Sequence, residues 1–544
     1  MTQTSTITLD ADVPVGPEPP SRPWFGVAAL WLFAAVPGGL ALLSAVRAPR
    51  MHVLPDYWHV LEKVTDDGGH LLLGQVFTNH LDQPFVIPSV LFWVDAAWFG
   101  GDNRVLTVVT VLLVVGIVLA LRSMLPFSPV TKAALTAGAS WVLLSSHAAE
   151  LWLQGTNGMS WVPAVFFSTV AIASAHRGRR WIAYTAALLG CLSFGAALPV
   201  WFVLGLVAWL RGDGRTRVVV PLAIGVVVVS AWWVTKPAGP QSLATSAFDP
   251  DGRLSVVGAA VGGLWSADNP TIAVIAGAVT LALLALLFGR TKARAGWVGL
   301  AGYSVALAVM LALGRTTSLV PGGNVGLVSR YVLVSALATV ALLALAALNR
   351  PQWPHRYVVT SVAAVALATH AIGGVKADNV RRSYVPLNLA AVAFRVDAPK
   401  TLDALRIQRR AAPAAQALHA YPFSDSFTLG CHGPELGDHV DLAAAQPLPT
   451  TATGPTHGEI DTSTVTGDVI ITGSAVIDGT PPDCVLVVDA TKTVTGAGIT
   501  SLPRTADQPP TTPDGVTWQA VASPNTTGAT VLAVKNGTLY RLSQ

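Results

Sequence analysis

Short basic loops alternate with long apolar runs along this chain, and that alternation limits the fold more than any other feature. Four of these loops lie at residues 177–180, 211–217, 290–294 and 350–356. Short loops rich in Lys and Arg stay on the cytoplasmic side of a membrane. Only 12 % of the residues are charged, against roughly 25 % in soluble domains. We therefore expect a polytopic α-helical membrane protein in which every second connection lies outside the cytoplasm.

The apolar runs have the length of membrane-spanning helices, which take roughly 20 apolar residues. Clear candidates are 25–46, 104–122, 130–147, 159–176, 218–236, 270–289, 296–314, 331–349 and 357–375. The run 181–210 is long enough for two short helices, with a turn near Phe194 and Gly195. Counting this run as a pair of helices places loop 290–294 on the cytoplasmic side. The prediction is about eleven spans within residues 25–376, with the N-terminus cytoplasmic and the C-terminus outside.

Three other segments are not spans. Residues 1–24 are polar and rich in proline, which is typical of a disordered cytoplasmic tail. The long outer loop 47–103 contains apolar stretches at 71–77 and 85–99 that are too short to cross a bilayer. They suit helices lying in the membrane interface. Residues 377–424 follow the last span and have the pattern of an amphipathic helical connector.

Residues 425–544 have a different pattern, with short apolar stretches separated by Gly, Pro, Asp and Asn. This pattern predicts an extracytoplasmic β-sandwich. Cys431 and Cys484 both fall in it, and two cysteines in one small domain outside the cytoplasm are more often a disulfide than free thiols. A metal site around Cys431, His432 and His439 is the rival interpretation.

Asp56 is the first candidate catalytic residue. It follows the first apolar run and stands beside Pro55 and close to Trp58. A carboxylate at an apolar membrane surface is partly desolvated, which raises its pKa and makes it a base for a hydroxyl nucleophile. The alternative is that Asp56 caps a helix, since Asp is common at helix starts.

The same loop holds weaker candidates. Asp66 and Asp67 precede two glycines, a pattern that could hold a sugar or a divalent metal. An ordinary Asp-Gly turn is the alternative. His59 is a further polar candidate for contact with an acceptor sugar, and hydrogen bonding is favoured over metal binding for it because no His-x-x-x-His spacing exists. No pattern requires a cofactor, and a divalent metal is the alternative.

Glu150, Trp152 and Gln154 lie together at one end of the third apolar run. Aromatic faces stack on sugar rings and amides bond hydroxyl groups, so these residues are candidates for binding a sugar or an acceptor. A belt of tryptophan at the membrane interface would give the same pattern.

Arg330, Tyr331 and Arg315 lie at the outer ends of two late spans. Arginine on the outer side runs against the positive-inside bias. Its planar guanidinium binds phosphate through paired hydrogen bonds, so these residues are candidates for binding a donor phosphate. Snorkelling at helix ends is the alternative.

Together these features resemble the GT-C superfamily of integral-membrane glycosyltransferases over nearly the whole chain. The likeness rests on the number of spans, the Pro-Asp-Tyr-Trp sequence at Asp56, the Arg330-Tyr331 pair and the C-terminal β region. It implies a polyprenyl-phosphate sugar donor, Asp56 as the catalytic residue and a bacterial plasma membrane. The β region resembles carbohydrate-binding-like tails of actinobacterial cell-envelope enzymes.

The expected activity is inverting transfer of a sugar to a cell-envelope glycan or lipid acceptor at the outer membrane face. A non-enzymatic transporter or flippase for an envelope lipid is one alternative. A scaffold whose tail binds glycan is another. Nucleic acid is an unlikely class of partner on composition, because the chain has no basic stripe with interleaved aromatic residues.

Overall fold

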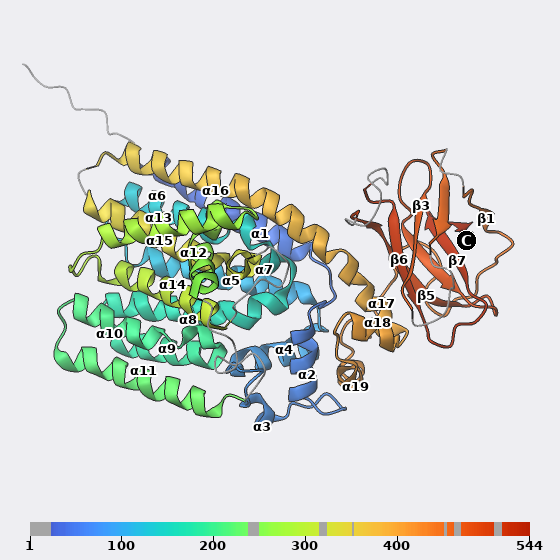
Figure 1. Cartoon of the computed structure of the whole chain (residues 1–544), viewed down its shortest axis with the longest axis horizontal. Coiled ribbons are helices and arrows are strands. Elements are labelled where there is room, and N and C mark those ends of the chain that lie inside the picture. Colours follow the sequence, from blue (N-terminus) through green and yellow to red (C-terminus); the bar gives the residue numbers. More distant parts are fainter. Residues whose placement is uncertain are drawn as a thin grey trace, which may run out of the picture.

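The structure is a computed structural model that describes residues 23–237, 250–314, 324–350, 353–450, 454–461, 469–504 and 514–543. A bundle of long helices occupies one part of the molecule, and a strand-rich region lies beside it (Figure 1). The last bundle helix, α16, leads out of the bundle toward the strands through the short helices α17 to α19. The predicted division into an apolar helical part and a C-terminal strand-rich part is confirmed.

The bundle is built from helices of 11 to 30 residues. Within the described residues they are α1 (Pro23–Val46), α5 (Asn103–Arg122), α6 (Pro129–Leu143), α8 (Gly155–His176), α9 (Arg180–Ser193), α10 (Val200–Leu210), α11 (Arg215–Thr235), α12 (Pro250–Gly262), α13 (Pro270–Leu286), α14 (Ala295–Gly314), α15 (Val332–Asn349) and α16 (His355–Tyr384). Asn269 caps α13 by accepting a hydrogen bond from the backbone of Ile272 at 3.1 Å, and Pro270 takes the first helical position.

Seven helices in the described residues are long and apolar enough to cross a membrane: α1, α5, α8, α11, α14, α15 and α16. Helices α12 and α13 meet at an angle of 91° and count as an eighth span only if they are taken together. Helices α6, α9 and α10, which the apolar pattern also predicts as spans, have 15, 14 and 11 residues. At about 1.5 Å per residue, each is shorter than the bilayer core.

The basic loops gather at one end of the bundle. Arg211 donates a hydrogen bond to the carbonyl of His176, and His176 Nδ1 accepts one from the backbone N–H of Gly296 at 3.1 Å. Arg294 Nη2 then bonds Asn349 Oδ1 at 3.1 Å. These contacts join residues in or next to all four basic segments, so the charge alternation in the sequence corresponds to one basic end of the fold.

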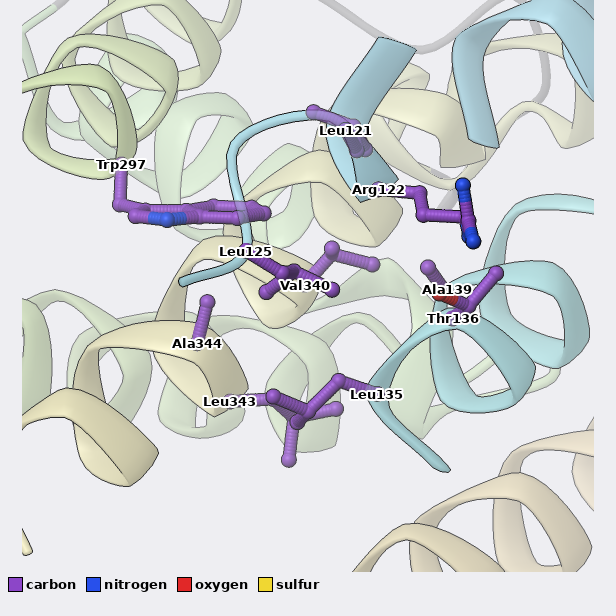
Figure 2. Close-up of a pocket in the computed structure, with 10 residues that line it drawn as sticks. All are labelled: Leu121, Arg122, Leu125, Leu135, Thr136, Ala139, Trp297, Val340, Leu343 and Ala344. Atoms are coloured by element: carbon purple, nitrogen blue, oxygen red, sulfur yellow. The ribbon is translucent and has the colours of Figure 1, made fainter. Parts of the chain in front are cut away.

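The helices at this basic end are closely packed. A pocket of ≈ 10 Å³ lies between α5, α6, α14 and α15, and Figure 2 shows Trp297 and Arg122 on opposite sides of it. That volume is about the space of one water molecule. The residues in Figure 2 therefore leave no space for a substrate between them.

The opposite end of the bundle carries the shorter helices. These are α2 (Pro55–Val64), α3 (Leu73–Val76), α4 (Val86–Phe99), α7 (Ala149–Leu153), α17 (Leu389–Arg395), α18 (Pro399–Ala404) and α19 (Ala412–Ala417). The apolar stretch 85–99 forms a helix as predicted, whereas 71–77 contains only the four-residue α3. The predicted amphipathic connector is three short helices rather than one, and α16 continues past residue 376 to Tyr384.

The strand-rich region is one hydrogen-bonded sheet in the order β1-β8-β7-β4-β5-β6-β3-β2. Its strands are β1 (Gln446–Pro447), β2 (His457–Ile460), β3 (Ile471–Val476), β4 (Cys484–Val488), β5 (Val494–Leu502), β6 (Thr517–Ala522), β7 (Thr530–Lys535) and β8 (Thr538–Arg541). The backbone N–H of Ile460 bonds the carbonyl of Ser543 at 3.1 Å, so the two ends of the sheet meet. The predicted disulfide between Cys431 and Cys484 is present, with Cα atoms 5.3 Å apart.

Alternate residues of β4 enter two different cores. Val485 and Val487 pack with Trp518 inside the rolled sheet. Leu486 and Val488 belong to a second cluster that includes Phe394 of α17. Because both faces of this strand are buried, the sheet is packed against the connector helices as well as closed on itself.

Candidate active site

A cavity of ≈ 630 Å³ opens at the end of the bundle opposite the basic loops. It is lined by Asp56, His80, Leu81, Asp82, Gln83, Phe85, Asn157, Ser160, Trp161, Phe194, Ala196, Pro237, Leu307, Met310, Leu311, Gly314, Arg330, Tyr331 and Val334. The loop 47–103 supplies one polar wall, and α14 supplies an apolar wall. Three residues predicted from the sequence, Asp56, Arg330 and Tyr331, therefore line one cavity although they are far apart in the chain.

Asp56 is the second residue of α2, and its side chain is 44 % exposed. It is not the N-cap of that helix; Leu54 has that position, and no side chain caps it. The nearest ionisable partner is His80, whose Nε2 lies 3.6 Å from Asp56 Oδ1. The helix-cap interpretation is therefore wrong for Asp56.

The pKa of Asp56 is lower than the ordinary value for an aspartate. Burial favours the neutral acid, but the contact with His80 and the charges of Arg330 and His59 favour the carboxylate and outweigh it. The predicted rise in the pKa is wrong, because the sequence indicated the apolar neighbours of Asp56 and not its approach to Arg330 and His80. Asp56 is a carboxylate at neutral pH and a weaker base than expected.

Arg330 is held in place from two sides. Its Nη1 lies 3.2 Å from Glu150 Oε2, and its backbone N–H bonds the same oxygen at 3.2 Å. Its guanidinium also lies over the ring of Tyr331, 5.1 Å from the ring centroid. The side chain is 21 % exposed, so a positive charge is fixed at the cavity wall.

The structure separates the three residues that were predicted to bind a sugar, which are Glu150, Trp152 and Gln154. Glu150 contacts Arg330 as described, whereas Trp152 is 3 % exposed and donates its indole N–H to the carbonyl of Ser145 at 3.1 Å. Gln154 is fully buried, and its side-chain oxygen accepts a hydrogen bond from the backbone of Val53 at 3.4 Å. None of the three is among the residues that line the cavity.

Asp66 and Asp67 form a turn away from the cavity. Asp66 Oδ1 accepts a hydrogen bond from the backbone of His70 at 2.8 Å, and this bond is the first cause of a lowered pKa of Asp66. Gly69 adopts a φ of +79°, as a tight turn requires. Asp67 is exposed. The described residues contain no cluster of three or more His, Cys, Asp or Glu side chains that could hold a metal ion.

The structure describes one of the two remaining predicted residues. His59 lies half-buried on α2, outside the lining set, and acts on Asp56 only through its charge. Arg315 lies outside the described residues.

A buried polar network beneath Asp56 was not predicted from the sequence. Asp95 Oδ2 accepts hydrogen bonds from Tyr57 OH and His52 Nε2, each at 3.0 Å, and His52 Nδ1 contacts Thr156 Oγ1 at 3.1 Å. Burial raises the pKa of Tyr57 well above its usual value, with Asp95 adding to the effect. The network joins α2, α4 and α8 and thereby fixes the start of α2. Asp95 is the single acidic residue in the apolar stretch 85–99, and it was the one sequence feature that could have indicated this network.

Other cavity residues also escaped prediction. Asn157 and Trp161 lie in the first turns of α8, and Asn157 Nδ2 contacts Tyr384 OH at 3.3 Å. The arrangement combines an accessible carboxylate, a fixed guanidinium and an apolar wall. Such a set can activate a hydroxyl group and bind an anion attached to a lipid.

Comparison with known proteins adds no relative: no family model, no curated protein and no solved structure matches this chain.

Proposed function

We propose that this chain is an integral-membrane glycosyltransferase of GT-C type, which transfers a sugar from a polyprenyl-phosphate donor to an envelope glycan or lipid with inversion. The observation that carries the proposal is that Asp56 and Arg330 line the same cavity of ≈ 630 Å³. This volume lies within the range of about 300–1,000 Å³ typical of ligand sites. The charge of Arg330 also acts directly on Asp56.

The two residues have separate roles in the proposed reaction. Arg330 binds the donor phosphate, and Tyr331 packs against its guanidinium. Asp56 receives the proton of the acceptor hydroxyl while the hydroxyl oxygen attacks the anomeric carbon. The bond from that carbon to the phosphate oxygen breaks, and its electron pair leaves with the lipid phosphate, next to Arg330.

The apolar wall of the cavity is evidence for a lipid-linked donor. Leu307, Met310 and Leu311 of α14 and Val334 of α15 line the cavity on the side of the bundle. Burying apolar surface contributes about 25 cal/mol per Å², so a lipid chain would gain affinity from this wall. The sugar and phosphate would then lie at the polar wall that the outer loop provides.

The proposed orientation places the basic end in the cytoplasm of a bacterial cell and the cavity outside. About eleven apolar segments would then cross or enter the membrane, with α9 and α10 as the short pair. The strand-rich region would lie outside the cytoplasm, as a β-sandwich-like module for envelope glycan. The disulfide between Cys431 and Cys484 agrees with an oxidising compartment.

The test uses the purified full chain in lipid nanodiscs with radiolabelled polyprenyl-phosphate pentoses and hexoses as donors. Asp56→Asn should lower turnover ~10²–10⁴-fold and keep donor binding, because it removes a proton acceptor without changing shape. Arg330→Ala should weaken donor binding instead. Arg356→Ala, at the basic end, is the matched control and should behave as wild type. Wild-type turnover in Asp56→Asn would contradict the proposal.

A lipid transporter is the second candidate. The observation that favours it is the 91° bend between α12 and α13, since broken helices are typical of transporters. The test places the protein in vesicles of the same lipid and adds a fluorescent polyprenyl phosphate. Movement of this lipid across the vesicle bilayer, with no sugar transfer from any donor, would favour a transporter over a glycosyltransferase.

A further inference from the structure

A tight turn in the outer loop holds His80 against the cavity. The backbone N–H of His80 bonds the carbonyl of Gln83 at 2.9 Å, and the N–H of Gln83 bonds the carbonyl of His80 at 3.0 Å. Between them Leu81 adopts a φ of +55°, which is rare for a residue with a branched side chain. A turn of this kind persists only when its surroundings fix it.

Three hydrogen bonds fix the turn to other parts of the bundle. Asn79 Nδ2 bonds the carbonyl of Thr235 at 3.1 Å, and Trp232 Nε1 bonds the carbonyl of Asp82 at 2.8 Å. The Gln83 side-chain oxygen accepts a hydrogen bond from the backbone of Gly195 at 3.1 Å. The turn is therefore anchored to the end of α11 and to the break between α9 and α10.

The anchored turn places a polar atom where it has no hydrogen-bond partner. His80 is 8 % exposed, its ring packs against Phe85 at 5.1 Å between centroids, and its Nε2 has no hydrogen-bond partner in the described residues. Buried polar atoms without partners are uncommon in folded proteins. The nearest ionisable group is Asp56, with Oδ1 at 3.6 Å.

We propose that His80 and Asp56 form a proton-relay pair, in which His80 takes over the proton that Asp56 receives from the acceptor. This inference rests on the proposed function. The acceptor O–H bond breaks and its proton moves to a carboxylate oxygen of Asp56. That proton then passes to His80 Nε2, which gives an imidazolium and restores the carboxylate. After the products leave, the proton returns through Asp56 to water in the cavity.

The order of the relay follows from the exposure of the two groups. Asp56 is 44 % exposed and can be reached by a hydroxyl, whereas His80 Nε2 is covered and is reached through Asp56. His80 is therefore a positioning and proton-accepting residue behind Asp56.

The experiment compares wild type, His80→Ala and His80→Gln in the nanodisc transfer assay. We expect turnover to fall ~10²-fold in both variants with the KM for the donor unchanged, since the donor phosphate is bound elsewhere. Free imidazole should restore turnover of His80→Ala, because the removed ring leaves space beside Asp56, and should not restore His80→Gln. His70→Ala, in an exposed turn of the same loop, is the control and should keep wild-type turnover.

Each other outcome overturns the inference. Wild-type turnover in both His80 variants would remove His80 from the reaction while keeping the glycosyltransferase. Lost turnover with a raised donor KM and no rescue by imidazole would assign His80 a purely structural role. Absence of transfer by the wild-type protein with every donor would overturn the proposed function, and the relay with it.

Discussion

Glu150 Oε2 bonds Arg330 twice, at the guanidinium Nη1 and at the backbone N–H, each at 3.2 Å. The carboxylate therefore sets both the position of the η5 backbone (Ser329–Tyr331) and the direction of the side chain. In the reverse direction the backbone N–H of Glu150 bonds Ser329 Oγ at 3.2 Å. Helix α7, which carries Glu150, and η5, which carries Arg330, therefore fix each other's position at the edge of the cavity.

This relationship predicts different effects of two substitutions at Glu150. Glu150→Ala should raise the KM for the donor about 10-fold, equivalent to about 1.4 kcal/mol, because Arg330 loses its hydrogen-bond acceptor. Glu150→Gln keeps an oxygen in place and should change the KM less. Steady-state kinetics with a labelled donor measures both. Equal effects of the two variants would show that charge, and not position, is the property Glu150 supplies.

The disulfide predicts a local loss of stability when it is removed. Cys431 and Cys484 are separated by 53 residues, and closing a loop of that length stabilises a fold by about 4 kcal/mol in the chain-entropy model. The double substitution to serine should lower the Tm of the strand-rich region and leave the bundle unchanged. Calorimetry of the full chain measures this effect. Free thiols in the wild-type protein extracted from membranes would contradict the pairing.

Much of the architecture could be predicted from local patterns. The charge of each loop is a local property, so the sequence was sufficient to predict that loops such as 177–180 and 290–294 share one end. The length of each helix was harder to predict from the sequence. The break in the run 181–210 was predicted near Phe194 and Gly195, and it lies between the end of α9 at Ser193 and the start of α10 at Val200. The run 130–147 was predicted as one span, but α6 ends at Leu143, because hydropathy does not mark where a helix stops.

The site depended more on contacts between distant segments. Asp56 and Arg330 were identified because their residue types are unusual at their positions. His80 was not assigned a role, since its approach to Asp56 depends on a turn anchored by Trp232 and Gly195. Trp152 looked accessible at the end of an apolar run, but the packing of neighbouring helices buries it.

The buried network at Asp95 predicts coupling between stability and activity. Asp95→Ala leaves Tyr57 OH and His52 Nε2 without their acceptor, at a cost of about 1–3 kcal/mol per unsatisfied group. Because Tyr57 is the neighbour of Asp56, turnover should fall with the Tm. Asp95→Asn keeps an oxygen and should lose less of both. Thermal melting in detergent measures stability, with the exposed Asp403→Ala as control. Wild-type stability in Asp95→Ala would contradict the role of the network.

The contact between α12 and α13 predicts a strict requirement for glycine. A Cβ at Gly277 would meet the backbone carbonyl of Gly258, and a Cβ at Gly262 would meet that of Ala273, so these helices touch through their backbones. Small residues allow such close approach in membrane bundles. Gly277→Ala should therefore lower the Tm and change the bend between the helices, since backbone atoms cannot move aside as a flexible side chain does. Gly39→Ala, in α1 with no atom near the added Cβ, is the matched control. Equal melting temperatures of the two variants would show that α12 and α13 separate without cost.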